Sequence, residues 1–587
     1  MNLDKKKHRI KTNNYDNGFF HQDLAKKRIL ALVPHEDDEI NTCGSLIKIL
    51  SICNAEVFVA YSTNGDWKFS AEIRIKEALA AAKVLGVRSE NVFFLGYGDS
   101  MANNEHNHIF YACEKVTCSP AGHCETYGTN LSSDYSYLIR EKHQPYTKNN
   151  FIDDIVSLIE NISADLIICS DLDDHPDHRM LSLAFDQAIG IVRKRNPNYT
   201  PDVFKTFAYS LAYNAVADHS ILNNPQTQKP TLGITDNYFV DLIDKSIYVW
   251  DARIRIPVVQ YKGRVNKGII SKALLKHKSQ HIISHADRII NSDEVYWSRR
   301  TDSISYNAKV IASSGNPSYL NDYMIINLEE VDSKAPKFAD YCWKPDDADD
   351  KRIAQFSWKE DQNIEQIRLY SSIDEESKIL ELSISFSDGY SMIINEIPNN
   401  GRPMIIDTGK REGIKWCSLR IISYKGSNYG LSECEIYADK DKGIDMPYCK
   451  LMANDNFIYE YYIKRSIRKI KLSLYSHHCE DRLLHLYVRK GHSTIHDYEI
   501  SIDRKDKDII VECSDDNENV WDRIKIIRVS DLRLFIYRIE TFLDISYIRK
   551  AKITKRIDRF IFRAKRDGII KTIKVAIVKM GNIENNE

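Results

Sequence analysis

Two short segments concentrate imidazole and carboxylate side chains, and each directly follows a run of apolar residues. The first is PHEDDE at residues 34–39, and the second is DDHPDH at residues 173–178. Zn²⁺ accepts histidine nitrogen and aspartate oxygen, and a catalytic zinc site uses three protein ligands and leaves one position open. A bound metal lowers the pKa of its water, so that a nearby carboxylate can take the proton. One such segment alone would indicate a solvated acidic loop, but two indicate a metal-dependent hydrolytic site.

The elements around these segments alternate between strand and helix through the first half of the chain. Apolar runs predict buried strands, and periodic stretches rich in Ala, Glu and Lys predict helices. This order predicts a Rossmann-like α/β domain with a parallel sheet covered by helices. Ligands gather at the carboxyl ends of strands in such sheets, where both segments fall. The expected strands are residues 28–33, 56–61, 91–95 and 165–169, and the expected helices are residues 44–53, 71–86, 151–162 and 178–193.

The two segments resemble the paired signature motifs of the PIG-L/LmbE-like family of zinc-dependent N-deacetylases. The resemblance covers approximately residues 25–305 and includes RIKE at residues 74–77 and LGYGD at residues 95–99. It implies removal of the acetyl group from an N-acetylglucosamine-type sugar that is nucleotide-, lipid- or glycan-linked, in glycan or glycoconjugate biosynthesis. Zn²⁺ is the implied metal, and Fe²⁺ or Co²⁺ could share the same ligands.

The resemblance also implies roles for individual residues. The implied metal ligands are His35, Asp38 and His178, and Asp37 matches the general base that activates the water. His175 matches the residue that stabilises the oxyanion and protonates the leaving amine, and Asp177 matches the carboxylate that orients or charges that histidine. Arg74 and Asp99 match positions that bind the substrate. For Arg74, the alternative is a surface ion pair with Glu77 on its own helix.

One position departs from the family pattern. The first motif commonly has proline where this chain has Glu36. Because this position is not a ligand, we expect the metal site to survive the change. The change from proline to glutamate could alter the rigidity of the loop or the charge near the substrate. The choice of substrate therefore stays open.

Two other functions fit parts of the pattern. A carbohydrate-binding protein could carry a vestigial hydrolase domain, but a vestigial site has no reason to keep every ligand and the base. A metal-dependent hydrolase could also act on another amide or on an ester. The sequence contains no evident glycine-rich phosphate loop or serine nucleophile elbow.

The second half of the chain predicts β-rich domains. Short strands separated by Gly, Asn, Asp and Ser begin near residue 311 and predict β-sandwiches. Residues 311–440 resemble galactose-binding-like sandwiches, through WCSLRI at residues 416–421 and YGLSECEIY at residues 429–437. This resemblance implies a bound glycan or a purely structural role. The predicted parts are a polar lead at 1–24, the deacetylase domain at 25–310, the sandwich at 311–440, a second β-rich domain at 441–545 and a basic helical tail at 546–587.

A polar insertion between the two motifs gathers cysteine and histidine. Its members are Cys113, Cys118, His123 and Cys124. A structural zinc site is one interpretation, but no CxxC pair is present. The preferred interpretation is a substrate-facing loop that covers the catalytic site.

A second stretch, residues 293–302, combines an aromatic ring with cations. Trp297, Arg299 and Arg300 could stack on a sugar or bind a phosphate. The preferred interpretation is a structural end to the catalytic domain.

The net charge of −1, from 82 Lys/Arg and 83 Asp/Glu, argues against a wholly basic protein but hides an asymmetry. Residues 549–579 hold twelve Lys/Arg and two Asp, a local charge of +10. Apolar residues recur there at helical spacing on both sides of Gly568, which predicts two amphipathic basic helices suited to an anionic membrane surface. A helical hairpin packed on the protein is the alternative. Sparse aromatic residues disfavour nucleic acid.

Other features of the sequence favour the cytoplasm. No apolar stretch approaches the ~18 residues of a transmembrane helix, and the first residues lack the apolar core of a signal peptide. The twelve Cys are scattered, which suits free thiols in a reducing compartment. We therefore expect a cytoplasmic protein, peripheral to the inner face of the membrane if the tail binds there.

The tail hypothesis predicts binding of the full-length protein to anionic vesicles at low ionic strength. The attraction should weaken as salt screens the basic residues. Co-sedimentation with vesicles containing phosphatidylserine measures it, and neutral vesicles are the control. A full-length protein that stays in the supernatant at low salt would reject a membrane role for the tail.

Overall fold

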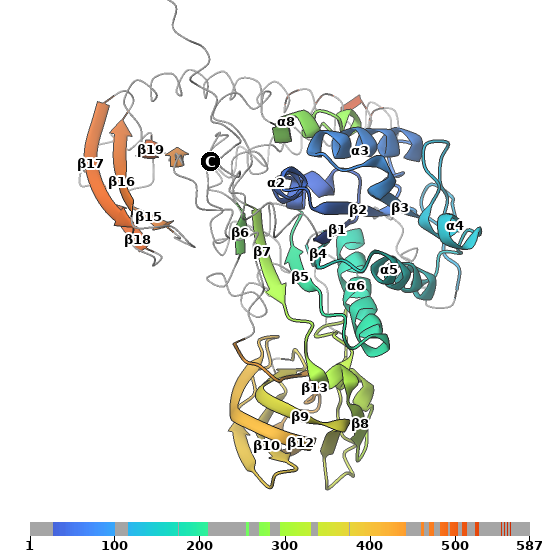
Figure 1. Ribbon diagram of the computed structural model, residues 1–587, viewed down its shortest axis with the longest axis vertical. Coiled ribbons are helices and arrows are strands. Elements are labelled where there is room, and N and C mark those ends of the chain that lie inside the picture. The colour runs from blue at the N-terminus through green and yellow to red at the C-terminus, as the bar shows by residue number, and fades with distance from the viewer. Residues whose placement is uncertain are drawn as a thin grey trace, which may run out of the picture. The chain divides into compact units, whose positions relative to one another are not determined.

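Figure 1 shows the computed structural model of the 587-residue chain. The structure describes residues 27–99, 115–173, 175–208, 254–256, 269–281, 294–329, 339–374 and 376–441, six strands between residues 459 and 527, and five helical positions of the tail. These residues fall into two compact units. One unit contains β1 to β13, and the other contains α8 (Ile269–Leu274) and β14 to β19.

A seven-stranded sheet forms the centre of the first unit. Its order is β3-β2-β1-β4-β5-β7-β6, with parallel pairing from β3 to β5 and antiparallel pairing from β5 to β6. Strand order reverses between β1 and β4, and ligands of doubly wound sheets bind at this switch point. The strands are β1 (Arg28–Val33), β2 (Glu56–Thr63), β3 (Val92–Tyr97), β4 (Leu166–Ser170), β5 (Asp202–Thr206), β6 (Ile254–Ile256) and β7 (Glu294–Arg299).

Two pairs of helices cover the sheet. Helix α2 packs beside α3, α5 packs beside α6, and Figure 1 shows the pairs on opposite faces. The expected α/β domain is therefore confirmed. Helix α2 begins six residues earlier than expected because the second half of the first motif forms its first turn. The helices are α2 (Asp38–Ile52), α3 (Ala71–Leu85), α4 (Tyr135–Arg140), α5 (Lys148–Ile162) and α6 (Pro176–Arg195).

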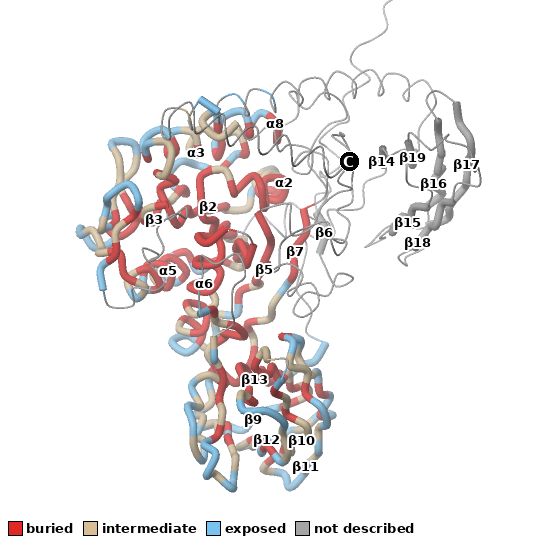
Figure 2. Tube along the Cα trace, turned by 180° about the vertical axis from the view of Figure 1, so that it is seen from behind, coloured by how far each residue is buried: buried red, intermediate tan, exposed pale blue. Residues whose placement is uncertain are grey.

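An antiparallel sheet with its own core follows in the same unit. Its order is β11-β10-β12-β9-β13, and β8 also pairs with β9. Figure 2 shows one group of buried residues among the strands of this β-rich part and another inside the α/β domain. This arrangement is consistent with the expected β-sandwich. The strands are β8 (Lys309–Ala312), β9 (Ile353–Ser371), β10 (Lys378–Phe386), β11 (Ser391–Asn395), β12 (Met404–Lys425) and β13 (Leu431–Tyr437).

The residues at 294–302 join these two parts of the first unit. Arg299 Nη2 lies 3.2 Å from Glu435 Oε1, and its guanidinium stacks over the ring of Tyr323. Arg300 pairs with Asp302 and lies over the ring of Tyr437. Both cations are engaged within the protein, so the structure supports a structural end to the α/β domain rather than a phosphate site.

The second unit contains short antiparallel sheets. One has the order β14-β19-β16-β17, and the other pairs β15 with β18. The strands are β14 (Tyr459–Tyr462), β15 (Lys469–Leu474), β16 (Arg482–Lys490), β17 (Ser493–Ile502), β18 (Lys507–Glu512) and β19 (Arg523–Ile527).

The described positions of the tail match part of one predicted amphipathic helix. Ile553, Ile557, Phe560 and Ile561 are helical, and their apolar side chains are exposed. The rest of both predicted tail helices lies outside the described residues. Within the part of the chain that the structure describes, no helix combines the length and apolarity needed to cross a bilayer.

Helix α6 packs closely against the β-rich part of the first unit, residues 311–440, and this contact leaves no room for a side chain at residue 190. A Cβ on Gly190 would lie 1.9 Å from the backbone oxygen of Asp322. Gly190→Ala should therefore lower the melting temperature by about 3 °C or more, because overpacking costs about 1–3 kcal/mol. Differential scanning calorimetry measures the change, with Lys194→Ala at an exposed position of the same helix as the control. Equal melting temperatures for Gly190→Ala and the wild type would contradict this close contact.

Candidate metal and catalytic site

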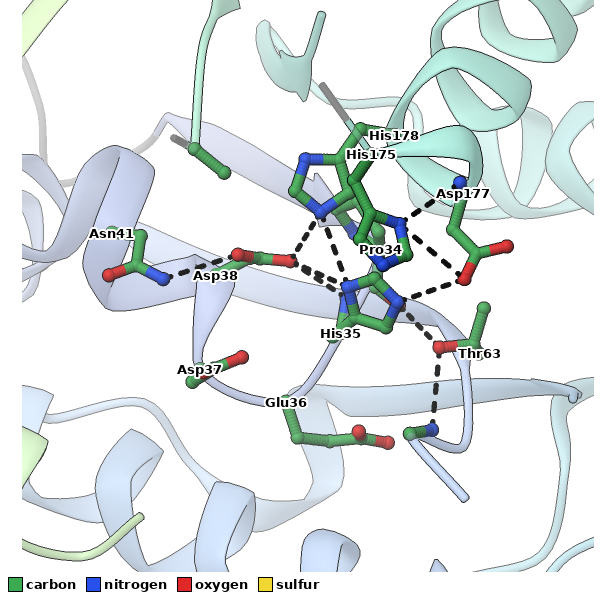
Figure 3. Close-up of polar contacts among 12 residues, drawn as sticks. Pro34, His35, Glu36, Asp37, Asp38, Asn41, Thr63, His175, Asp177 and His178 are labelled. Carbon is green, nitrogen blue, oxygen red and sulfur yellow. Dashed lines mark hydrogen bonds and ion pairs between the residues drawn. The ribbon is translucent and has the colours of Figure 1, made fainter. Parts of the chain in front are cut away.

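Both motif segments lie at the carboxyl ends of neighbouring strands. β1 pairs with β4 in parallel register, Leu32 opposite Cys169, so the loops that follow them meet. The first loop runs directly into α2 and the second into α6. Figure 3 shows His35, Asp38 and His178 converging from these loops.

Three atoms of the predicted metal ligands form a nearly equilateral triangle. His35 Nδ1 lies 3.1 Å from Asp38 Oδ2, and His178 Nε2 lies 3.2 Å from each of them. Tetrahedral ligands at about 2.1 Å from one ion lie about 3.4 Å apart. The three side chains are buried. Their donor atoms, spacing and burial therefore fit a single divalent cation.

Buried carboxylates fix the tautomers of both histidine ligands. His35 Nε2 donates to Asp177 Oδ2 at 3.0 Å, and His178 Nδ1 donates to Asp173 Oδ2 at 2.8 Å. Once the cluster loses the protons that its charges retain, each neutral ring turns its other nitrogen, with its lone pair, toward the triangle. Carboxylates that support metal-binding histidines in this way are a regular part of metal sites.

The charges in the cluster shift its protonation toward charged imidazoles and carboxylates. Burial alone lowers the pKa of His178, but Asp173 and Asp38 outweigh it and raise the pKa to about 9. Burial also opposes the charged form of His35, yet hydrogen bonds to Asp177 and Asp38 bring its pKa well above the usual value. Burial would raise the pKa of Asp38, but the charge of His178 holds it well below its usual value. The triangle thus attracts cationic charge.

His175 lies edge-on to His35, with ring centroids 4.6 Å apart. It supplies none of the three triangle atoms, but one of its nitrogens lies within 4.8 Å of ligand atoms of His35 and His178, so these three histidines also form a candidate metal group. Its Nδ1 accepts a hydrogen bond from the backbone N–H of Asp177 at 3.2 Å. In the neutral ring the proton therefore resides on Nε2. Burial and the charges of His35 and His178 hold the pKa of His175 well below its usual value. This residue is therefore a neutral hydrogen-bond donor through Nε2.

Asp177 lies closer to a metal ligand than to the histidine that it was expected to orient. Its Oδ2 is 3.0 Å from His35 Nε2 and 3.7 Å from His175 Nδ1. The contact with His175 is made mainly by the Asp177 backbone. The carboxylate of Asp177 therefore interacts with His35 rather than with His175.

Arg74 is buried, with 3% of its surface exposed, and connects the first motif to α3. Its Nη2 lies 3.4 Å from Asp37 Oδ1, and its Nε donates to Glu36 Oε2 at 3.3 Å. The alternative of a surface ion pair for Arg74 is therefore wrong. Burial raises the pKa of Glu36 to about 7, although the charge of Arg74 opposes the shift. The residue that replaces the common proline thus anchors the arginine beside the predicted base.

Asp99 lies at the edge of the same cluster. Its Oδ1 is 3.9 Å from His35 Nε2, and its backbone N–H donates to Asp66 Oδ1 at 2.7 Å. All eight predicted site residues, from Arg74 and Asp99 to the ligands, are thus gathered in one region of the structure.

Sequence reasoning missed Asp173 and Asp66. The first lies inside the second motif, four residues after the expected strand end at residue 169, and an acidic residue there is the signal that could have found it. The second belongs to the NGD turn at residues 64–66, directly after β2. Both stand at carboxyl ends of parallel strands, as the predicted ligands do.

The polar insertion holds a disulfide rather than a zinc site. Cys118 and Cys124 are bonded to each other, which leaves neither sulfur free to bind zinc, and Cys113 lies outside the described residues. The expectation of free thiols is therefore wrong for this pair. The other described cysteines are free and buried.

The α/β domain carries the signature of a known family. Residues 30–189 match the PIG-L family model, described as GlcNAc-PI de-N-acetylase, so the chain contains a PIG-L family domain there. Residues 303–437 match a family that is described only as a domain of unknown function, DUF7402.

A relative and two solved structures show partial similarity. A Dictyostelium discoideum protein named "Probable N-acetylglucosaminyl-phosphatidylinositol de-N-acetylase" is 26% identical over 178 residues, which are 30% of this chain and 53% of that protein. The chain thus spans about half the length of this curated relative.

The first structure is N,N'-diacetylchitobiose deacetylase from Pyrococcus horikoshii, with a TM-score of 0.20, 21% identity, and coverage of 32% of this chain and 55% of that one. The second is the family 32 carbohydrate-binding module of NanJ from C. perfringens, with a TM-score of 0.18, 11% identity, and coverage of 22% and 94%.

The hydrogen bond from His178 to Asp173 predicts an effect on metal affinity. Asp173→Asn keeps the shape of the side chain but removes the charge that fixes the histidine tautomer. Zn²⁺ affinity should fall about 10- to 100-fold, as for other carboxylates that support metal-binding histidines. Competition titration with a chromogenic chelator measures it.

Asp153→Asn, at an exposed position of α5, is the matched control for that titration. Circular dichroism verifies that both variants are folded. Unchanged Zn²⁺ affinity in folded Asp173→Asn would show that this carboxylate does not support the site.

Proposed function

We propose that this chain is a metal-dependent hydrolase that removes the acetyl group from an N-acetylglucosamine-type sugar. The observation that carries the proposal is the triangle of His35, Asp38 and His178 beside the carboxylate of Asp37. The PIG-L match at residues 30–189 and the name of the Dictyostelium relative support the choice of an N-acetylated amino sugar. The reaction would serve glycan or glycoconjugate biosynthesis. The cytoplasm is the proposed location, although the Cys118–Cys124 disulfide favours an oxidising compartment.

His35, Asp38 and His178 would hold the metal, with Zn²⁺ proposed and Fe²⁺ or Co²⁺ able to use the same ligands. When bound, such an ion lowers the pKa of water and polarises the acetyl carbonyl. Asp177 and Asp173 keep the two imidazoles in the ligating tautomer.

The remaining residues move protons and stabilise charge. Asp37 takes a proton as the water oxygen bonds to the acetyl carbon, and Arg74 holds its carboxylate in place. His175 donates from Nε2 to the oxygen that gains negative charge. As the C–N bond breaks, the proton that Asp37 took from water passes to the departing nitrogen, while the Nε2–H of neutral His175 keeps its hydrogen bond to the oxygen. Because neutral imidazole is a weak acid, this step replaces the expected role of His175 as the proton donor. The products are acetate and the free amino sugar.

The substrate contacts and the other partners belong to the proposal as well. Arg74 and Asp99 would border the sugar, and the β-rich part at residues 311–440 would bind a glycan or serve as a structural support. The basic tail would attach the protein to an anionic membrane surface. The complete set of ligands with an adjacent carboxylate favours an enzyme over a vestigial domain. A hydrolase of another amide or an ester is the second candidate, and the same assay tests it.

The assigned base predicts separate effects on turnover and metal binding. Asp37→Asn cannot take the proton from water, so acetate release should fall at least ~100-fold, the usual contribution of general base catalysis. Metal content should stay at the wild-type level because Asp37 is not part of the triangle. Enzymatic acetate assays on a panel of N-acetyl sugars, together with elemental analysis, measure both quantities.

Glu72→Gln, at an exposed position of the same helix as Arg74, is the control. Near-normal acetate release by Asp37→Asn would show that the base is assigned wrongly. Wild-type protein that hydrolyses none of the sugars but cleaves other amides or esters would favour the second candidate.

A further inference from the structure

The disulfide-closed loop rests on the end of β3, next to Asp99. A Cβ on Gly98 would lie 2.2 Å from the Cβ of Ser119, so the base of the loop touches this strand end directly. The backbone N–H of Thr117 donates to the oxygen of Tyr146, and the N–H of Tyr146 donates to the oxygen of Cys124. Both ends of the loop are therefore fixed to the same buried residue.

The tip of this loop has a defined shape. The N–H of Gly122 donates to the oxygen of Ser119 at 2.8 Å, which closes a turn with Pro120 at its second position. The N–H of Ser119 donates to the oxygen of His123 at 2.7 Å, and the Cys118–Cys124 bond closes the loop outside this turn. Residues 120–123 are exposed, so this set of bonds holds a surface element.

The loop presents a stacked pair of rings. The imidazole of His123 lies on the ring of Tyr127, with centroids 3.8 Å apart and an angle of 20° between the planes. Tyr127 is held by three hydrogen bonds, from its N–H to Gly96, from Asn64 to its backbone oxygen, and from its hydroxyl to Asp66. One face of the His123 ring is therefore covered by a rigid partner while the residue is exposed.

Short polar contacts connect this pair to the metal ligands. The Tyr127 hydroxyl donates to Asp66 Oδ2 at 2.5 Å, and Asp66 Oδ1 accepts from the backbone N–H of Asp99 at 2.7 Å. Asp99 in turn lies 3.9 Å from a nitrogen of His35. The stack is thus joined through two hydrogen bonds to Asp99, which lies beside the metal cluster.

We propose that His123, backed by Tyr127, forms an outer subsite for an uncharged sugar ring linked to the N-acetylated one. The proposal rests on the proposed deacetylase function and names its substrate class as an oligosaccharide or glycan. Flat rings with fixed partners suit the apolar face of a sugar, and ligand sites commonly combine such rings with a few polar groups. The charged groups that connect the stack to the cluster are the carboxylates of Asp66 and Asp99, which repel phosphate and accept hydrogen bonds from sugar hydroxyls.

Calorimetric binding tests the subsite independently of turnover. The probes are GlcNAc and N,N'-diacetylchitobiose, with zinc-loaded Asp37→Asn as the background so that neither probe is consumed. The background should bind the disaccharide more tightly than GlcNAc. Adding His123→Ala should weaken disaccharide binding about tenfold, the loss of one good ring contact, and leave GlcNAc binding unchanged. His123→Trp should retain the preference because it restores a flat ring.

Lys194→Ala, at an exposed position near the C-terminal end of α6, is the control and should change neither affinity. Equal affinity of the background for the two probes, or equal loss of both in His123→Ala, would overturn the subsite. If the background prefers the disaccharide through His123 but the wild type releases no acetate from it, the subsite stands and the proposed function fails.

Discussion

The site depends on the parallel pairing of β1 with β4. These strands are distant in sequence and adjacent at the point where strand order reverses, so the loops that follow them meet at one edge of the sheet. His35 and Asp38 come from one loop and His178 from the other. Because their donor atoms must lie about 3 Å apart, a register shift of one residue between β1 and β4 would separate the ligands and leave their carboxylate partners misaligned.

Electrostatics explains why such a cluster can exist in a buried place. Carboxylates and imidazoles are costly to bury unless they neutralise one another or bind an ion. Here the pKa values of His35 and His178 rise while that of Asp38 falls, so the cluster retains protons in the place where a divalent cation would bind. Metal binding would release those protons. The same attraction holds Arg74 against Glu36 and Asp37.

The sequence was sufficient for the central elements and for the residues that cluster. Both motifs are local patterns at strand ends, and the periodicity of the intervening segments predicts their helices. The partners of these residues could not be predicted, because they depend on contacts between distant segments. The sequence predicts that Asp177 orients His175, but its carboxylate meets His35. It allows either a substrate contact or a surface ion pair for Arg74, whereas the buried side chain contacts Glu36 and Asp37. The disulfide between Cys118 and Cys124 could not be predicted, because the sequence shows that these cysteines are close along the chain but not that their sulfur atoms meet.

The central claim is that one ion is held by His35, Asp38 and His178. A crystal structure of zinc-loaded protein, with anomalous data collected on both sides of the zinc edge, tests it most directly. We expect a single strong anomalous peak about 2.0–2.2 Å from His35 Nδ1, Asp38 Oδ2 and His178 Nε2. A peak that has His175 as a ligand in place of Asp38, or full-occupancy zinc elsewhere with none at this triangle, would contradict the account.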